Sequence, residues 1–262
     1  MNRLFFKILR KVVNVLQLGC QQGAELEKDA AYAQGKGWGG GTIQDEVSAC
    51  LNLLSGVPRV FVDIGGNKGH YTQEVLRRFP DIEVFLFEPA SANIPVLKAA
   101  FSSLANVYLS SLALSDISGQ QILYADRPGS ELASLSKRRL DHFGINMDCA
   151  EQIEAQRFDA FWTSTRRGGV IDYVKMDVEG HELSVLRGFG ALLPTVRLIQ
   201  FEFGGCNIDS RTFFQDFWYF FAENDFSIYR ITPSGVAKID SYVESDEFFS
   251  TTYYIALNNR SL

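Results

Sequence analysis

One stretch of the sequence indicates how this chain folds: Val60-Phe61-Val62-Asp63-Ile64-Gly65-Gly66-Asn67-Lys68-Gly69. Its first five residues form a short apolar run, which is typical of a strand buried on both faces of a parallel sheet. Glycines follow at once, and residues 70–79 then predict a helix that Pro80 ends. A glycine-rich turn between a strand and a helix lets the backbone turn tightly and brings a ligand close to the helix N-terminus.

The same alternation of strands and helices continues toward the C-terminus. Further strands are predicted over residues 83–87, 107–114, 171–176 and 196–203, and helices over 91–104, 182–193 and 212–223. This pattern predicts an α/β fold, with a mostly parallel sheet and helices on both faces. Two closing strands, 226–231 and 251–257, lack a helical crossover and predict an antiparallel strand at one edge. The aromatic residues of 212–223 recur at helical spacing, which favours a place in the core.

Two segments interrupt this pattern. Residues 126–165 lack an apolar strand run, and we interpret them as an insertion beside the sheet. Residues 1–56 predict a helical N-terminal extension, with a short helix over 44–54 and a flexible glycine-rich linker over 35–41. The main domain is therefore expected to span residues 57–262.

The N-terminal residues 1–18 predict a basic amphipathic helix. Arg3, Lys7 and Arg10 belong to one polar stripe, with apolar residues elsewhere on the helix. We favour docking of this helix on its own domain or on a second subunit in a homodimer, and peripheral contact with an anionic membrane is the alternative. No apolar run is long and clean enough to span a bilayer, and no signal-peptide pattern is present, so we expect a cytoplasmic protein.

Composition narrows the classes of partner. Hydrophobic residues make up 46% of the chain and charged residues 21%, which is ordinary for a globular protein. The net charge of −6 gives no general basic field, so no nucleic-acid partner is expected. The four cysteines are scattered without metal-type spacing, and we expect reduced, buried thiols rather than a metal centre or a disulfide framework.

Acidic residues follow the first three predicted strands. Glu88 stands 25 residues after Asp63, where a carboxylate accepts both hydroxyls of a ribose, as in an adenosine ligand. Asp116, after the third strand, is a natural partner for the adenine amino group, although a plain turn residue is an equal interpretation. The glycine spacing is not GxGxxG, which counts against a dinucleotide pyrophosphate site.

With these features, the chain from Phe61 to Phe203 resembles the FkbM-type methyltransferases that depend on S-adenosylmethionine. The matching segments are Phe61 to Tyr71, Phe87-Glu88-Pro89, Ala113-Leu114-Ser115-Asp116, Ile171 to Glu182 with its Lys175-Met176-Asp177-Val178-Glu179-Gly180 block, Leu186-Arg187-Gly188, and Gln200 to Phe203. Gly66 stands where the family often has alanine, and residues 126–165 match only over 129–135.

The resemblance implies a Rossmann-like class I methyltransferase sheet and S-adenosylmethionine as methyl donor. It also implies O-methylation of a sugar, a glycan or a related secondary metabolite. The residues expected to hold the donor are Asp63, Gly65, Gly66, Asn67, Gly69, Glu88 and Asp116.

The acceptor side is predicted at the ends of the strands 171–176 and 196–203. Asp177, Glu179, His181 and Glu202 converge there as candidates to orient the acceptor or take its proton. We favour Asp177 and Glu179, with His181 second, and interpret Glu182 as a residue that caps the next helix. Asp177, Glu179 and His181 also have the chemistry of an Mg²⁺ or Mn²⁺ site, but without a third carboxylate we predict no metal.

Three alternatives remain open. The run Lys137-Arg138-Arg139 would bind a phosphate or a sugar acid, although a solvated helix face is the interpretation we favour. A nicotinamide-dependent oxidoreductase would also need glycines and an acid after the second strand. A non-catalytic protein that binds S-adenosylmethionine or a partner is the third.

Overall fold

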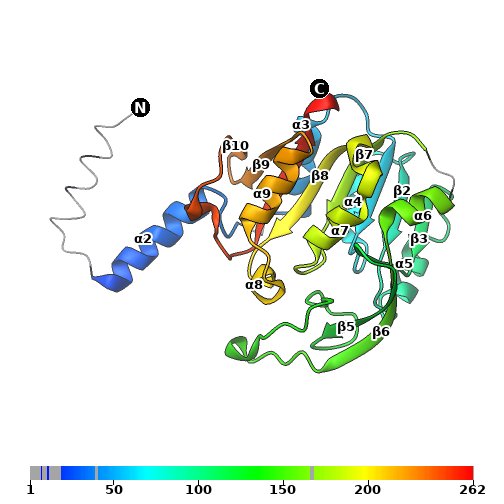
Figure 1. Ribbon diagram of the computed structural model, residues 1–262, viewed down its shortest axis with the longest axis horizontal. Coiled ribbons are helices and arrows are strands. Elements are labelled where there is room, and N and C mark those ends of the chain that lie inside the picture. Colours follow the sequence, from blue (N-terminus) through cyan, green and yellow to red (C-terminus); the bar gives the residue numbers. More distant parts are fainter. Residues whose placement is uncertain (1–6, 8–10, 12–18, 39–40, 166–167, 262) are drawn as a thin grey trace.

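The computed structural model describes residues 7, 11, 19–38, 41–165 and 168–261 (Figure 1). The predicted amphipathic helix over residues 1–18, with its expected membrane or subunit contact, therefore lies outside the described residues except at Lys7 and Lys11. Among the described helices, none has the length and apolar character needed to cross a membrane.

The centre of the molecule is an eight-stranded sheet in the order β10-β9-β11-β8-β7-β1-β2-β3. Its strands are β1 (Val60–Ile64), β2 (Glu83–Phe87), β3 (Val107–Ser110), β7 (Ile171–Met176), β8 (Val196–Phe203), β9 (Phe226–Thr232), β10 (Gly235–Ile239) and β11 (Thr252–Asn258). The five strands from β3 to β8 pair in parallel. This arrangement confirms the predicted α/β class.

The antiparallel end of the sheet is confirmed, with one addition. β11 runs antiparallel to both β8 and β9 and lies between them, and β10 pairs antiparallel with β9 at the edge. We did not predict β10, because its side chains are exposed or only half-buried and no apolar run marks them. An edge strand with one partner needs no apolar run to form.

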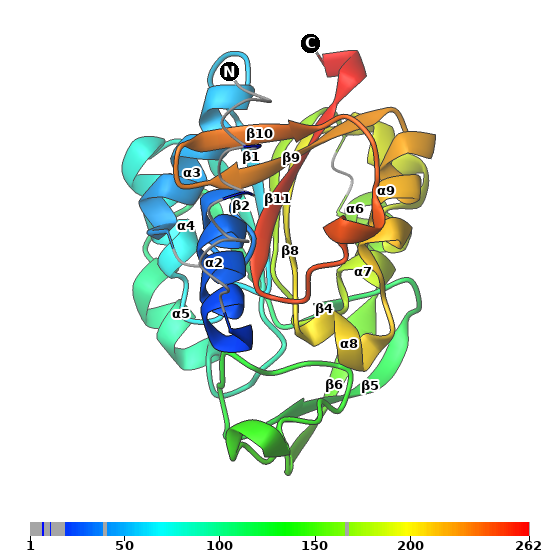
Figure 2. The ribbon, with the colours of Figure 1, turned by 90° about the vertical axis from the view of Figure 1, so that its left-hand side faces the viewer.

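Helices cover both faces of the sheet (Figure 2). α3 (Ile43–Leu53), α4 (His70–Arg78) and α5 (Ile94–Phe101) pack on one face, and α6 (Phe158–Ser164), α7 (Glu182–Gly188) and α9 (Phe214–Glu223) on the other. Successive strand residues alternate between two apolar cores, as the two-residue repeat of a strand requires. In α9, Phe214, Phe217 and Phe221 are fully buried, which confirms the core interpretation for one face of the aromatic helix, whereas Phe213 and Tyr219 are about half exposed.

A second, three-stranded sheet lies beside the first, in the order β4-β6-β5. It consists of β4 (Ala113–Leu114), β5 (Gly119–Ala125) and β6 (Cys149–Gln156). Residues 126–165, which have no apolar run, nevertheless contain the strand β6, and its residues 149–155 pair with β5. Exposed residues alternate with half-buried or buried ones over 149–155 of β6, so this strand of a half-exposed sheet has no apolar run.

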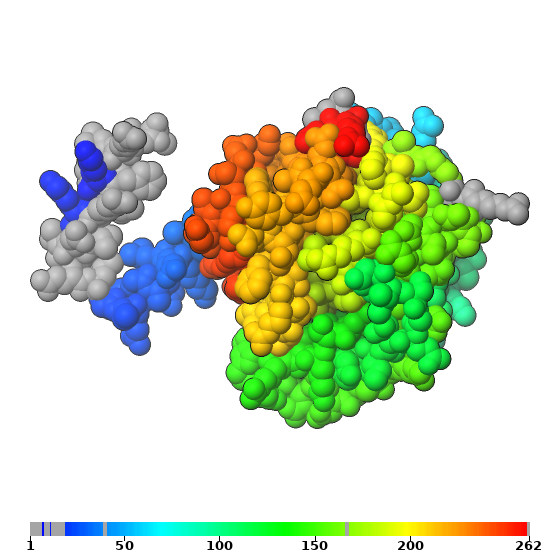
Figure 3. Space-filling model, viewed as in Figure 1, coloured from blue at the N-terminus to red at the C-terminus, as the bar shows by residue number. Residues whose placement is uncertain are grey.

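The N-terminal segment has two parts. α2 (Cys20–Ala33) stands away from the rest of the molecule, whereas α3 packs on the sheet (Figures 1 and 3). The expected linker is not free at residues 35–38, because the Gly37 amide donates to Thr252 Oγ1 at 2.9 Å. A Cβ at Gly35 would lie 2.3 Å from the Ile231 carbonyl oxygen, so this glycine permits close packing.

The cysteines are free thiols, as predicted, but their burial differs from the prediction. Cys50 and Cys206 are buried, whereas Cys20 is exposed and Cys149 is half-buried. The two exceptions lie on α2 and β6, elements whose outer faces contact solvent.

Candidate active site

A cavity of about 850 Å³ opens at the carboxyl ends of the parallel strands. The glycine loop after β1, Glu88 after β2 and the segment 177–181 after β7 line it, together with residues from α3, β11 and the segment 126–148. In α/β sheets this edge is where ligands bind, because the loops that follow parallel strands meet there.

The glycine loop is shaped by close contacts. Gly65 has φ 77°, and a Cβ there would lie 1.9 Å from the Asp177 carbonyl oxygen. A Cβ at Gly66 would lie 2.8 Å from the Leu86 side chain. Gly65, Gly66 and Asn67 line the cavity. Gly69 does not, and its small size instead makes room for the Phe101 ring, 2.5 Å from where a Cβ would be.

Glu88 is buried and holds the loop in place. Its carboxylate accepts hydrogen bonds from the Asn67 amide at 2.8 Å, the Ala90 amide at 2.9 Å and Asn93 Nδ2 at 3.2 Å. Burial raises the pKa of this carboxyl group, and the three hydrogen bonds oppose the shift. Glu88 also lines the cavity, so its carboxylate connects the loop to any ligand there.

Asp63 lies beneath the cavity rather than on its wall. Its carboxylate accepts a hydrogen bond from Thr72 Oγ1 at 2.6 Å and lies 3.5 Å from Lys175 Nζ. Lys175 lines the cavity, donates to the Gly65 carbonyl oxygen at 3.0 Å and lies 3.8 Å from Asp177. Burial alone would lower the pKa of Lys175, but its acidic neighbours outweigh that effect and raise it. We assigned Lys175 no role, although it belongs to the motif that contains Asp177.

Asp116 and His181 meet through Ser115. Ser115 Oγ lies 2.9 Å from His181 Nε2 and donates to Asp116 Oδ1 at 3.1 Å. His181 lines the cavity, and Asp116 is not among the lining residues. Burial lowers the pKa of His181, with Asp116 opposing, so the imidazole is neutral near pH 7.

Three carboxyl groups gather at the far side of the cavity: Asp177, Glu179 and Glu202. Glu179 has φ 54° and forms an ion pair with Arg138, yet burial and the nearby Asp177 raise its pKa to about 8. Burial, with Asp177, Glu179 and Glu182 close by, raises the pKa of Glu202 well above its ordinary value. Burial therefore favours the protonated form of Glu202, which offers a hydrogen-bond donor.

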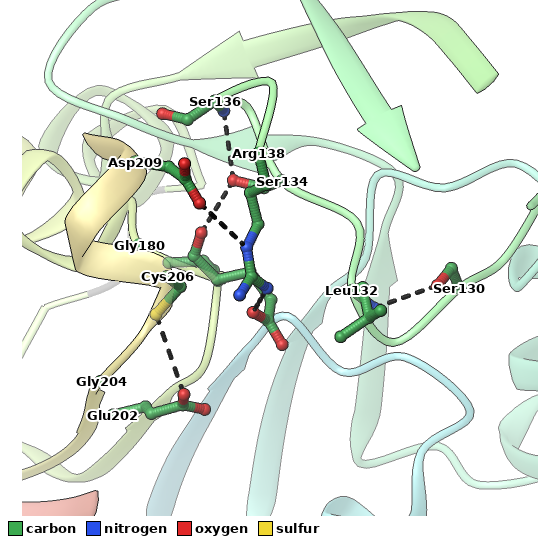
Figure 4. A network of polar contacts seen from close by, with 12 residues as sticks. Ser130, Leu132, Ser134, Ser136, Arg138, Gly180, Glu202, Gly204, Cys206 and Asp209 are labelled. Carbon is green, nitrogen blue, oxygen red and sulfur yellow. Dashed lines mark hydrogen bonds and ion pairs between the residues drawn. The ribbon is translucent and has the colours of Figure 1, made fainter. Parts of the chain in front are cut away.

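The side chain of Arg138 is only 9% exposed, which contradicts the solvated helix face expected for residues 137–139 at this one residue. Its guanidinium contacts Glu179, and its Nε lies 3.7 Å from Asp209 Oδ2 (Figure 4). The segment 126–148 is mostly loop, so adjacent residues do not share one helical face. Lys137 and Arg139 have the expected exposure, with 58% and 88% of their side chains in solvent.

The side chains that could together hold a metal ion are not the set Asp177, Glu179 and His181 that the sequence suggested. Ligand atoms of Glu179, Glu202 and Cys206 lie within 4.8 Å of one another, and His181 is not among them. Cys206 Sγ donates to Glu202 Oε1 at 3.8 Å (Figure 4). Because Arg138 already supplies a positive charge at Glu179, we do not assign this cluster to a metal.

The cavity also has wall residues that the motifs do not contain. Glu46 of α3 and Tyr253 of β11 line it. Glu46 had no signal in the sequence, because an acid in the first turn of a helix is ordinary. Tyr253 is opposite Glu202 in the register of β11 and β8, a pairing that depends on where the last strand inserts.

Comparisons with protein families and with individual proteins all point to methyltransferases. A family model described as the methyltransferase FkbM domain matches residues 63–228, more than half of the chain. The 2-O-methyltransferase NoeI of Sinorhizobium fredii (strain NBRC 101917 / NGR234) is 26% identical over 162 residues, covering 58% of this chain and 66% of its own length. Methyltransferase 1 of Beauveria bassiana (strain ARSEF 2860) is 28% identical over 142 residues, covering 48% of this chain and 57% of its own length.

Among solved structures, methyltransferase FkbM from Methylobacillus flagellatus KT aligns with a TM-score of 0.46 at 13% identity. The alignment covers 89% of this chain and 60% of that protein. The chain thus spans less than two thirds of the length of each of these three relatives.

Proposed function

This chain belongs to the FkbM methyltransferase family, and on that premise we propose that it transfers the methyl group of S-adenosylmethionine to a hydroxyl oxygen of a sugar, a glycan or a related metabolite. The observation that carries the proposal is that one cavity combines the two halves of such a site. The glycine loop and Glu88 lie at one end, and Asp177, Glu179 and Glu202 lie at the other.

The residues at the first end fit the donor. A buried carboxylate at the end of β2 suits ribose hydroxyls, and the missing side chains at Gly65 and Gly66 allow close approach to the backbone. Of the seven residues expected to hold the donor, Gly65, Gly66, Asn67 and Glu88 are the ones we assign to direct contact. Asp63 and Gly69 would support the loop from behind, and Asp116 would act through Ser115.

Methyl transfer is an in-line displacement, and S-adenosylmethionine supplies the activated methyl group when it is bound. The protein must hold the acceptor oxygen in line with that group and remove the hydroxyl proton. We assign the proton to Asp177, whose carboxylate faces the cavity beside Lys175, whereas Glu179 is already paired with Arg138. Glu179, the protonated Glu202 and His181 would orient the acceptor.

The acceptor class rests on two points. The polar groups around Asp177 suit a ligand with several hydroxyls, and NoeI is by name a 2-O-methyltransferase. The lining charges also bear on the acceptor. Asp177 and Glu179 face Lys175 and Arg138, and burial favours the uncharged form of Glu202, so the acids do not exceed the cations in charge. This balance suits a neutral acceptor.

The first test is binding of S-adenosylhomocysteine by isothermal titration calorimetry. We expect micromolar affinity for the wild type, at least about tenfold weaker affinity for Glu88→Gln, and wild-type affinity for Glu154→Gln on the exposed face of β6. Thermal melting checks that each variant is folded. If the wild type bound NADH and not S-adenosylhomocysteine, the proposal would fail in favour of an oxidoreductase.

The second test follows labelled methyl groups from S-adenosylmethionine into a panel of neutral, amino and acidic glycans. Transfer that falls about 100-fold or more in Asp177→Asn, with binding of S-adenosylhomocysteine retained, is the expected result. Binding without transfer to any hydroxyl in the panel would instead favour a non-catalytic binding protein.

A further inference from the structure

The cavity extends beyond the part of the chain that the family model covers. Residues 63–228 match the family, yet Gly37, Ile43 and Glu46 line the cavity from the N-terminal side. Of these three, Glu46 has an ionisable side chain. It lies in the first turn of α3 and is 7% exposed.

A buried hydrogen-bond network fixes the position of Glu46. Its Oε2 accepts a hydrogen bond from Gln200 Nε2 at 2.6 Å. The orientation of the Gln200 amide is determined, because its Oε1 accepts from Tyr173 OH at 2.9 Å, from Cys50 Sγ at 3.2 Å and from Tyr71 OH. The amide NH₂ group must therefore face Glu46, and the carboxylate is held at the wall of the cavity.

Glu46 lacks a close counter-ion within the protein. No lysine or arginine nitrogen of the described residues lies within ion-pair distance of its carboxylate. Lys175 attracts it, but Lys175 is already engaged by Gly65, Asp63 and Asp177. Burial raises the pKa of Glu46 to about 7, against the effects of Gln200 and Lys175. A buried carboxylate in this position is stabilised by a cation that enters from the cavity.

The strand order shows which part of a ligand reaches Glu46. β2, β1 and β7 are neighbours, and they carry Glu88, the glycine loop and Lys175 in that order. The register also aligns Asp63, Lys175 and Gln200 in one row across β1, β7 and β8. A ligand whose ribose is at Glu88 and whose middle crosses Gly65 extends its far end over β7, beside the Gln200 amide that holds Glu46.

From this juxtaposition we propose that Glu46 binds the α-ammonium group at the amino-acid end of S-adenosylmethionine. This inference rests on the proposed function, because it assumes that S-adenosylmethionine is the methyl donor. The ammonium group supplies the missing counter-ion and donates a hydrogen bond to the carboxylate. The segment before the family domain thus completes the donor site and leaves Asp177 to the acceptor.

Two ligands test the proposal by calorimetry, since they differ in the end that Glu46 would bind. S-adenosylhomocysteine has the amino-acid end, and 5′-methylthioadenosine has the same nucleoside and sulfur without it. We expect Glu46→Gln to raise the Kd of S-adenosylhomocysteine about 10- to 100-fold, as for a lost hydrogen bond to a charged group, and to leave the Kd of 5′-methylthioadenosine within about twofold. Asp45→Asn, an exposed neighbour on α3 whose amide can still cap the helix, should change neither Kd.

The outcomes separate this proposal from the one on which it rests. An unchanged Kd of S-adenosylhomocysteine in Glu46→Gln would overturn it, and so would an equal loss for both ligands, which marks a structural role. If the wild type bound neither ligand, the proposed function itself would fail.

The pH dependence gives an independent readout. Affinity of the wild type for S-adenosylhomocysteine should fall as the pH drops from 8 to 6, because protonation removes the charge of Glu46. Other charged or titratable groups around it are Lys175, Asp177, Asp45, Tyr253 of β11 and the buried Tyr71, Tyr173 and Cys50. All of these groups remain in Glu46→Gln. Any difference between the pH dependence of the affinity in this variant and in the wild type is therefore due to Glu46. A variant with the same pH dependence as the wild type would contradict the proposal.

Discussion

At the scale of single residues, Gly65 illustrates what the donor loop requires. Gly65 and Gly56 share φ 77°, but a Cβ at Gly65 would lie 1.9 Å from a backbone oxygen, whereas one at Gly56 would meet no atom within 4 Å. Both alanine variants incur the cost of a left-handed residue, about 1–2 kcal/mol. Gly65→Ala should lose about 1–3 kcal/mol more, because the ends of β1 and β7 must separate.

Urea unfolding of both variants measures this difference. We also expect Gly65→Ala to bind S-adenosylhomocysteine more weakly than Gly56→Ala does, since the displaced loop lines the cavity. Equal losses of stability in the two variants would show that the backbone conformation, and not the contact with Asp177, determines the need for glycine.

At the scale of elements, polar contacts of Arg138 and Ser134 help to tie the segment 126–148 to the residues that follow β7 and β8. Arg138 pairs with Glu179 and Asp209, and Ser134 Oγ donates to the Glu179 carbonyl oxygen at 2.7 Å (Figure 4). The side chain of Arg138 is 9% exposed, so its removal leaves Glu179 without a cation in a buried place. The segment should then open more often.

Hydrogen exchange followed by mass spectrometry tests this expectation. In Arg138→Met, amides of residues 126–148 should exchange at least about tenfold faster than in the wild type. Arg139→Met is the matched control, because that neighbouring side chain pairs only with the exposed Asp141 among the described residues. The same acceleration in both variants would argue against the Arg138 contacts as the tether.

At the scale of the whole molecule, buried acids make stability depend on pH. Burial raises the pKa of Glu46 and Glu182 to about 7, that of Glu179 to about 8, and that of Glu202 well above its ordinary value. The folded state therefore holds more protons than the unfolded state above about pH 4.5. Each group lowers the free energy of unfolding by about 1.4 kcal/mol per pH unit between its unfolded and folded pKa. His181, whose pKa is lowered, acts in the opposite direction.

Thermal melting between pH 5.5 and 8.5 should thus show a Tm that falls as the pH rises, with a shallower slope in Glu202→Gln. The ion-paired Glu74 has a pKa lowered to about 2, so its stabilising contribution is constant over this range. A Tm that rises steadily from pH 5.5 to 8.5 would show that these carboxyl groups are charged and stabilised in the folded protein.

The sequence by itself determined the parts of this protein that depend on local signals. The apolar run of β1, the glycines after it and Pro80 after α4 predicted the strand, the turn and the helix together, because each signal acts within a few residues. The buried strands β2, β7 and β8 followed in the same way. Strands β6 and β10 did not, since their half-exposed faces give no apolar run.

The tertiary structure alone decided which side chains share the cavity. Gln200 meets Glu46 across 154 positions of sequence, and Arg138 meets Glu179 across 41. Ser115, next to Asp116, contacts His181 across 66 positions, and Asp63 pairs with Lys175 beneath the wall. Residue patterns report the preferences of short segments, whereas these contacts depend on strand order, on register and on where the last strand inserts into the sheet.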